Sequence, residues 1–193
     1  IIDPHGQLID DVLPFIPRER ADDVIYFNPG DLERPIGINL LEAKTPEEKE
    51  LVALDSMNIM IKLFNEEIFG PRIQDYFRNG CLTLMEDPEG GALTDIVRLF
   101  TDDDYQKYKV EKVKNPIVKS FWENQMAKTG AREKQEMIPY FASKFGQFVT
   151  NTMMRNIIGQ AKSSFDFADA MNEGKIMLMN LSKGTTGEIN SKL

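Results

Sequence analysis

Two short apolar runs, one near each end of the sequence, most constrain the fold that this chain can adopt. The first is Ile1-Ile2, followed by Asp3-Pro4-His5-Gly6, and the second is Ile176-Met177-Leu178-Met179, followed by Asn180-Leu181-Ser182-Lys183-Gly184. An apolar run that ends abruptly in polar, glycine-containing sequence is typical of a buried strand whose carboxyl end opens into a loop. We therefore expect an α/β fold in which both runs belong to one sheet and most of the intervening chain is a helical excursion.

A third strand is expected early in the chain. Val24-Ile25-Tyr26-Phe27 is apolar and is stopped by Asn28-Pro29-Gly30-Asp31. Before it, apolar residues recur at helical spacing from Leu8 to Ile16 and predict a short amphipathic helix. The chain thus begins β-α-β, and the crossover has about the length that a parallel pair of strands requires.

Residues 45–172 are predicted to form an all-helical domain. Thr45-Pro46-Glu47-Glu48 has the pattern of a capping box with proline in the first turn, which starts a helix. Further cap and proline signals predict about five or six helices up to residue 159, and one more short helix after it. The core face of the first helix is predicted to carry Leu51, Leu54, Met57, Ile61, Phe64 and Ile68.

Three parts follow from this pattern. Residues 1–44 are the first part of an α/β domain, residues 45–172 are an inserted helical domain, and residues 173–193 return to the sheet. Glu188-Ile189-Asn190-Ser191-Lys192-Leu193 looks like a helix that has not finished. Because the first residue already lies inside an apolar strand, we expect the chain to be a piece of a longer protein.

Composition narrows the functional classes. With 23 Lys and Arg against 31 Asp and Glu, the formal charge is -8, so any contact with nucleic acid has to be local. The only cysteine, Cys81, lies in an apolar helical context and is expected to be a buried thiol in a reducing compartment. No apolar run approaches the roughly 18 to 20 residues that span a bilayer, and no leader opens the chain, so we expect a soluble, cytoplasmic segment.

The polar residues after the two terminal strands are the candidate site. Asp3 and His5 stand where one strand opens into a loop, a place suited to orienting water or a phosphate, although a turn stabilised by Asp3 explains them as well. Asn180, Ser182 and Lys183 can each donate to an anionic oxygen, and a helix cap and loop is the structural alternative. No metal site is predicted, because the single histidine has no partner at ligand spacing.

Charged residues of the helical domain offer a second, weaker signal. Lys107, Lys109, Lys112 and Lys114, with Tyr105 and Tyr108 among them, are candidate DNA contacts. A solvated face of mixed charge is the alternative, because the acidic run Asp102-Asp103-Asp104 dilutes the cluster. That run is itself explained by the start of a helix, where the dipole favours negative charge. The stripe of Phe141, Phe145 and Phe148 is predicted to be core.

Absent motifs limit the chemistry of this chain. It has no G-x-x-x-x-G-K-[ST] loop, no G-x-G-x-x-G, and no acidic pair at the end of an apolar strand. The chain by itself therefore lacks the phosphate cradle of a nucleotide-hydrolysing enzyme, and no catalytic residue is assigned.

Several segments, in order along the whole chain, resemble the bacterial conjugation and type IV secretion ATPases. These are the coupling-protein-like, HerA/FtsK superfamily of DNA-translocating motors. The segments are Ile1-Ile2-Asp3-Pro4-His5-Gly6-Gln7-Leu8, residues 17–29, residues 35–42, Asn115-Pro116 with Phe121-Trp122, Phe148 with residues 155–160, Ser163-Ser164-Phe165-Asp166, and residues 174–184 with Gly187-Glu188.

The resemblance implies a RecA-like P-loop ATPase sheet with a large all-helical insertion, assembled in the parent protein as a homo-hexamer that moves DNA through its pore using ATP and Mg²⁺. It places Asp3, His5, Asn180, Ser182 and Lys183 near the nucleotide or in a sensing role. The resemblance implies that the family's nucleotide-binding motifs lie outside this sequence, Walker A before Ile1 and Walker B after Leu193. This fragment is therefore expected to be inactive alone and to bind no cofactor tightly. The parent is expected in the cytoplasm, held at the inner membrane through other components.

Two further functions stay open from the sequence. One is a non-catalytic helical interaction module that docks on secretion-system components or on a cargo protein, which the acidic charge and the large helical region favour. The other is a separate α/β hydrolase using Asp3 and His5, which lacks an evident nucleophile.

Overall fold

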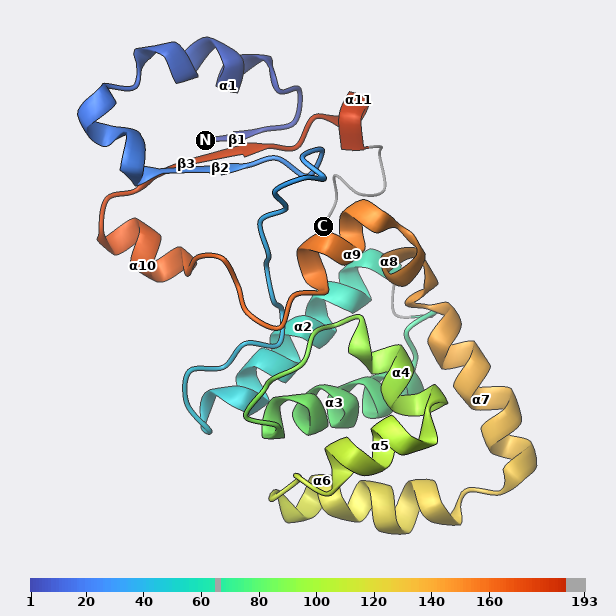
Figure 1. Cartoon of the computed structure of the whole chain (residues 1–193). Coiled ribbons are helices and arrows are strands. Elements are labelled where there is room, and N and C mark those ends of the chain that lie inside the picture. The colour runs from blue at the N-terminus through green and yellow to red at the C-terminus, as the bar shows by residue number, and fades with distance from the viewer. Residues whose placement is uncertain (65–66, 187–193) are drawn as a thin grey trace.

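The structure, a computed structural model, describes residues 1–64 and 67–186 of the chain. Three short strands form one parallel sheet, and all other elements are helical (Figure 1). The predicted parallel strands and the large helical region are confirmed, whereas the extension of the sheet into a RecA-like core stays a prediction. The helix predicted over Glu188 to Leu193 lies outside the described residues. The strands are β1 (Ile2–Asp3), β2 (Val24–Phe27) and β3 (Ile176–Asn180).

The strand order is β1-β3-β2, with β3 in the centre. Ile2 and Phe27 lie opposite Met179 from the two sides. The prediction that β1 and β2 form a pair is therefore wrong, because β3 separates them. Burial agrees with this order: Leu178 of the central strand β3 is completely buried, whereas Ile2 of the edge strand β1 is 67% exposed.

Helices lie on both sides of the sheet. Figure 1 shows α1 (Gln7–Val12) above the strands and α10 (Phe167–Asn172) below them. Ile9 of α1 and Ala170 of α10 are buried. The first helix is shorter than predicted, because Pro14 stands in the following turn and the chain there becomes a 3-10 helix (Leu13–Phe15). A second 3-10 segment (Arg18–Asp23) leads into β2.

Two connections run between the sheet region and the helical body: residues 28–44 follow β2, and residues 159–166 lead to α10 (Figure 1). The two connections are bonded to each other. The Ser164 N–H donates to the Gly37 carbonyl at 2.9 Å. The Asn39 amide donates to the Ala161 carbonyl at 2.8 Å and to the Gly91 carbonyl at 3.1 Å. Asn39 therefore ties both connections to the loop that precedes the fourth helix.

Helix α3 (Pro71–Glu86) is the central helix of the body, and it packs against α2, α4, α5 and α6. Between residues 45 and 159 the described chain forms eight α-helices rather than five or six, because caps such as Asp102 and Asn115 restart a helix after each short break. The remaining helices are α2 (Glu48–Phe64), α4 (Asp95–Thr101), α5 (Asp103–Val110), α6 (Pro116–Ser120), a π-helical turn (Phe121–Met126), α7 (Ala131–Ser143), α8 (Gly146–Thr150), α9 (Thr152–Ile158) and, after β3, α11 (Lys183–Thr186).

Helix α2 departs from its prediction at two points. It begins at Glu48 rather than Thr45, and the Glu48 carboxylate accepts from the Lys44 N–H at 2.8 Å. Its predicted core face is partly wrong, because Leu51, Leu54 and Ile68 are 58%, 43% and 40% exposed, and Ile68 lies beyond the end of the helix. The residues of α2 that are buried are Ala53, Ser56 and Met60.

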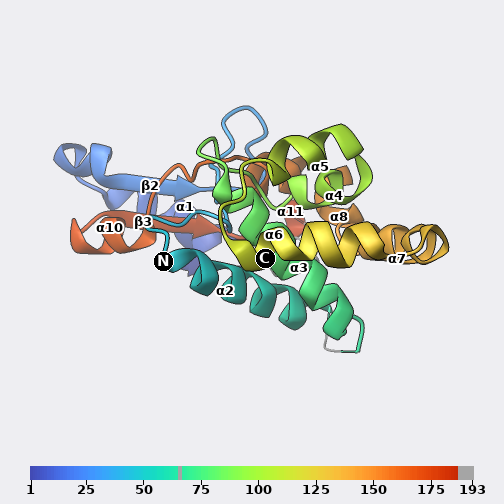
Figure 2. The same ribbon diagram turned by 90° about the horizontal axis from the view of Figure 1, so that it is seen from below.

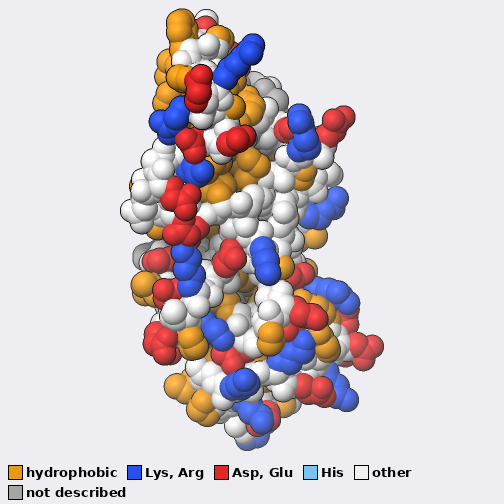
Figure 3. Space-filling model, turned by 60° about the vertical axis from the view of Figure 1, so that its left-hand side comes forward, with side chains coloured by type: hydrophobic (Ala, Val, Ile, Leu, Met, Phe, Trp, Pro, Cys, Tyr) orange, Lys and Arg blue, Asp and Glu red, His pale blue; other side chains and the backbone are white. Residues whose placement is uncertain are grey.

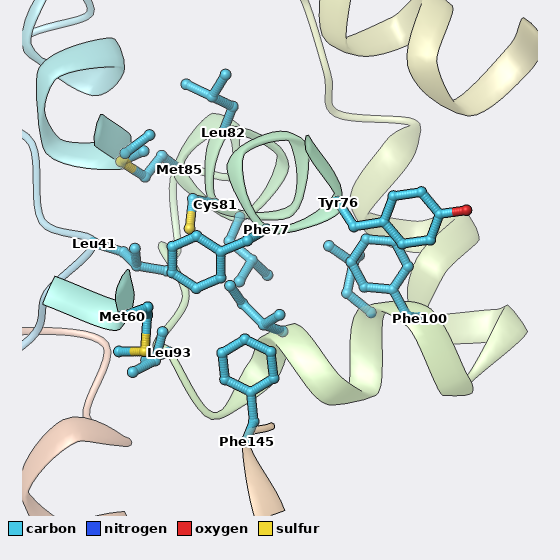
Figure 4. Packing of buried hydrophobic residues seen from close by; sticks show 14 of the residues in the cluster. Leu41, Met60, Tyr76, Phe77, Cys81, Leu82, Met85, Leu93, Phe100 and Phe145 are labelled. Atoms are coloured by element: carbon cyan, nitrogen blue, oxygen red, sulfur yellow. The ribbon is translucent and has the colours of Figure 1, made fainter. Parts of the chain in front are cut away.

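Aromatic rings fill the core of the helical body. Phe141, Phe145 and Phe148 are buried as predicted, and the Phe141 ring centroid lies 4.8 Å from that of Phe100. Figure 4 shows the Phe145 ring and the Cys81 thiol directed into the same packed region. Cys81 is buried, as predicted. Burial raises the pKa of its thiol well above the usual range, so the unreactive thiol form is favoured.

Candidate functional site

The candidate site is the edge of the sheet where β1 and β3 end side by side. Asp3 pairs with Asn180, and the Leu181 N–H donates to the Asp3 carbonyl at 2.8 Å. Further along the two loops, the Lys183 N–H donates to the Pro4 carbonyl at 3.4 Å. The loops after the two strands therefore run together, and the sequence-predicted site residues of both loops meet at this carboxyl edge of the sheet.

Asp3 is held inside this edge by the backbone. Its side chain accepts from the His5 N–H at 2.9 Å and from the Ile9 N–H at 3.2 Å, and the residue is 4% exposed. Burial raises the pKa of the Asp3 carboxyl, but hydrogen bonds from backbone N–H groups, led by that of His5, lower it by more, so the pKa lies below 3.8. Asp3 thus stabilises the turn and the start of α1, which was the structural alternative.

Asn180 fixes the second loop. Its amide nitrogen donates to the Tyr26 hydroxyl at 3.4 Å, and its amide oxygen accepts from the Ser182 N–H at 3.2 Å. Tyr26 was not predicted as a site residue; its position at the end of a neighbouring strand is the signal that could have identified it. His5 and Lys183 are exposed, so an imidazole and an ammonium are accessible at this edge. Both groups can donate to anionic oxygens.

Gly6 is a further residue of this edge that the sequence did not single out. Its φ is +86°, and a Cβ built on it would lie 2.9 Å from the Asn180 side-chain oxygen and 3.3 Å from the Ser182 Cβ. Any side chain at this position would be strained and would displace the Asn180 amide.

Gly6→Ala is expected to lower the free energy of unfolding by about 3 kcal/mol, from backbone strain together with the collision with Asn180. Gly174→Ala is the matched control, because Gly174 also has a positive φ of +68° but no atom within 4 Å of the added Cβ. We expect it to cost about 1 kcal/mol. Urea denaturation of both variants measures the difference, and equal losses would contradict a packing role for Gly6 at the site.

The predicted DNA-contacting lysines divide into two pairs. Lys107 and Lys114 are exposed, whereas Lys109 and Lys112 are bound to Asp87 at the end of α3. The Lys109 ammonium lies 2.6 Å from the Asp87 carboxylate and its side chain is 5% exposed. Lys109 is therefore buried in an ion pair and is not accessible to DNA. Figure 3 shows acidic and basic side chains interspersed along one face of the molecule.

The ionised Asp87 side chain makes stability depend on pH. Burial raises the pKa of its carboxyl, but hydrogen bonds from Lys109, the Glu89 N–H and Lys112 lower it by more, so the folded-state pKa lies below the ordinary value of 3.8. The stability that the ionised Asp87 carboxylate contributes is fully present when the pH is above the carboxyl pKa in the unfolded chain. It is lost as the pH falls through the lower pKa of the folded state.

Urea unfolding measured at about pH 6 and below about pH 3.5 is therefore expected to show a loss of stability in acid. A doubly substituted chain, Asp87→Leu with Lys109→Met, lacks this titrating pair and should lose less between the same two pH values. An equal loss in both chains would show that Asp87 does not carry the effect.

In the described residues, no group of three or more His, Cys, Asp or Glu side chains is arranged to hold a metal ion. No helix in that part of the chain is long and apolar enough to cross a membrane. Comparison of the chain with known protein families, curated proteins and solved structures finds no match.

Proposed function

We propose that this chain is the central part of an ATP-driven motor that translocates DNA, with its sheet in the ATPase domain and its helices inserted between two strands. The residues that resemble the conjugation and type IV secretion ATPases support this proposal. The order of elements supports it as well: the chain leaves the sheet after β2, passes through α2 to α9, and returns as β3 between β1 and β2.

The observation that carries the proposal is the carboxyl edge shared by β1 and β3. In open α/β sheets, ligands bind outside the carboxyl ends of the strands. At this edge His5 and Lys183 offer accessible donors, while Asp3 and Asn180 hold the two loops in register. We assign His5, Ser182 and Lys183 to contact or sense nucleotide phosphates, with ATP and Mg²⁺ held mainly by motifs outside this sequence.

DNA contact in the proposed motor is local. The formal charge of -8 is unfavourable for a surface that binds DNA everywhere. Lys107 and Lys114 are the accessible members of the predicted basic cluster. The assembly proposed for the parent is a homo-hexamer in the cytoplasm. Secretion-system proteins are proposed to hold it at the inner membrane.

ATP turnover tests the proposed function. The 193-residue chain alone is expected to hydrolyse no ATP, because it lacks the phosphate cradle. In the parent protein, Lys183→Ala is expected to lower DNA-stimulated turnover about tenfold or more, as the loss of a charge-stabilising donor does. Lys128→Ala, an exposed lysine of the helical body, should leave turnover unchanged. Steady turnover by the 193-residue chain that Lys183→Ala abolishes would overturn the proposal.

A second function, a helical module that docks on secretion components or a cargo protein, is favoured by one observation. Leu51, Leu54 and Ile117 are exposed on neighbouring helices. DNA binding by the chain at increasing salt separates the two functions, because phosphate contacts give a steep loss of affinity. Absence of DNA binding at low salt would favour the docking module.

A further inference from the structure

Three helices of the body line a groove made of two adjoining hollows. The residues that each contributes recur at helical spacing, so each helix turns a single stripe toward the groove. Helices α2, α3 and α6 are neighbours in the view from below (Figure 2). The stripe of α2, with the residue just before it, is Glu47, Glu50, Leu51 and Leu54; the stripe of α3 is Asp75, Arg78, Asn79 and Leu82; and α6 with its continuation supplies Pro116, Ile117, Ser120 and Asn124.

The groove consists of two adjoining hollows of about 580 and 630 Å³. Arg78, Asn79 and Ile117 line both hollows, so the two hollows lie side by side. From Asp75 to Leu82 the α3 stripe rises about 10 Å along the helix axis. A groove of this length accommodates roughly two turns of a helix laid along it, which is the scale at which helix-in-groove recognition operates.

The groove is apolar at its rims. Leu51, Leu54 and Ile117 are 58%, 43% and 72% exposed, although Leu51 and Leu54 have the spacing of core residues. Leu82 is 9% exposed and borders the groove from the core, and Figure 4 shows it on the side of α3 opposite Phe145. Aliphatic side chains that lie together at the surface, bordered by polar groups, are typical of an interaction site.

The charges of the groove have a definite order. Glu47 and Glu50 are exposed where α2 borders the groove, and neither side-chain carboxylate has a hydrogen bond or ion pair with another described residue. Arg78 is exposed in the middle and is likewise without an ion pair in the described part of the chain. Asp75 is already bound, since its carboxylate accepts from the Asn79 and Gln125 amides.

We propose that this groove binds an amphipathic helix of a partner protein whose aliphatic residues cover Leu51, Leu54 and Ile117 and whose basic residues face Glu47 and Glu50. An acidic side chain of the partner pairs with Arg78. A second copy of this chain fits less well, because a two-fold contact of this face with itself brings Arg78 near its own copy. The proposal deepens the docking function and does not depend on the motor function.

Selection from a displayed library of helical peptides on the full chain tests the proposal. The enriched peptides are expected to carry an aliphatic stripe at i, i+3, i+4 and i+7 flanked by Lys or Arg. By fluorescence anisotropy with one enriched peptide, Leu54→Asp and Ile117→Asp are each expected to weaken binding at least about tenfold. Leu8→Asp is the matched control, because Leu8 is 52% exposed but lies in α1, beside the sheet.

A charge variant tests the basic side of the partner independently of the apolar contacts. Glu50→Lys is expected to weaken binding several-fold at low salt, with the difference shrinking as salt screens the charges. Circular dichroism confirms that each variant is folded. The proposal is overturned if no peptide is enriched, if the enriched peptides are acidic, or if Leu54→Asp binds them as tightly as the unchanged chain. It is also overturned if the chain self-associates through this face and Leu54→Asp abolishes the self-association.

Discussion

Replacing Asp87 by alanine is expected to cost about 3–5 kcal/mol in the free energy of unfolding, because it leaves a buried ammonium without its counter-charge. Lys109 is 5% exposed at its side chain and would keep the Gly90 carbonyl, 2.8 Å away, as a hydrogen-bond partner but no carboxylate among the described residues. Lys112 also loses both of its contacts with the carboxylate. Urea denaturation at neutral pH measures the loss.

Two further chains isolate the cause of this loss. Lys112→Ala should cost less than about 1 kcal/mol, because Lys112 reaches solvent and Asp87 retains Lys109. The doubly substituted chain with Asp87→Leu and Lys109→Met should lie within about 1 kcal/mol of the unchanged chain, since neither charge is then buried alone. If the double substitution costs as much as Asp87→Ala, the loss comes from packing and not from the unpaired ammonium.

Phe141→Ala is the second change expected to have a large effect, at about 3–5 kcal/mol. Phe141 is completely buried, and its ring lies 4.8 Å from Phe100, 5.0 Å from Phe145 and 6.0 Å from Tyr76 between ring centroids. Its removal leaves a cavity where rings from several helices meet, and those helices cannot all close on it.

The same substitution at an exposed position provides the control. Phe15 is 85% exposed, so Phe15→Ala should change stability by less than about 0.5 kcal/mol. Thermal and urea unfolding of the two variants give the comparison. A loss for Phe141→Ala as small as that for Phe15→Ala would show that the aromatic cluster does not stabilise the helical body.

The sequence identified the strands and several helix starts because these depend on local residues. Apolar runs predicted β1, β2 and β3, and Asn115 caps α6 as its place before a proline indicates. The strand order could not be predicted in this way, because it depends on which strand is buried from both sides. Nothing local in Leu178 distinguishes a central strand from an edge strand.

The face of α2 shows a second limit of sequence patterns. Two overlapping stripes satisfy helical spacing, and the larger residues Leu51 and Leu54 made one of them look like the core. The buried stripe instead contains the small residues Ala53 and Ser56, and the Ser56 hydroxyl donates to the Leu40 carbonyl at 2.6 Å. Small residues allow close approach of a neighbouring helix, which a hydrophobicity pattern does not register.

For the candidate site, the pattern predicted which residues stand at the ends of the strands but not how each is used. The Asp3 carboxylate accepts from the N–H groups of His5, in the turn, and of Ile9, in α1; both lie close in sequence, so these bonds were foreseeable as the structural alternative. The partner of Lys109 was not foreseeable, because Asp87 lies 22 residues away and the ion pair forms only after α3 and α5 pack together.

The bonded pair of connections between the sheet and the helical body has a mechanical consequence. A single flexible tether would let the two parts pivot freely, but here one segment leads from the end of β2, a second leads through α10 to the start of β3, and the two are bonded to each other and, through Asn39, to the body. Rotation of the sheet against the helical body would have to break these hydrogen bonds together. We therefore expect the strands and the helical body to rotate as one unit rather than independently.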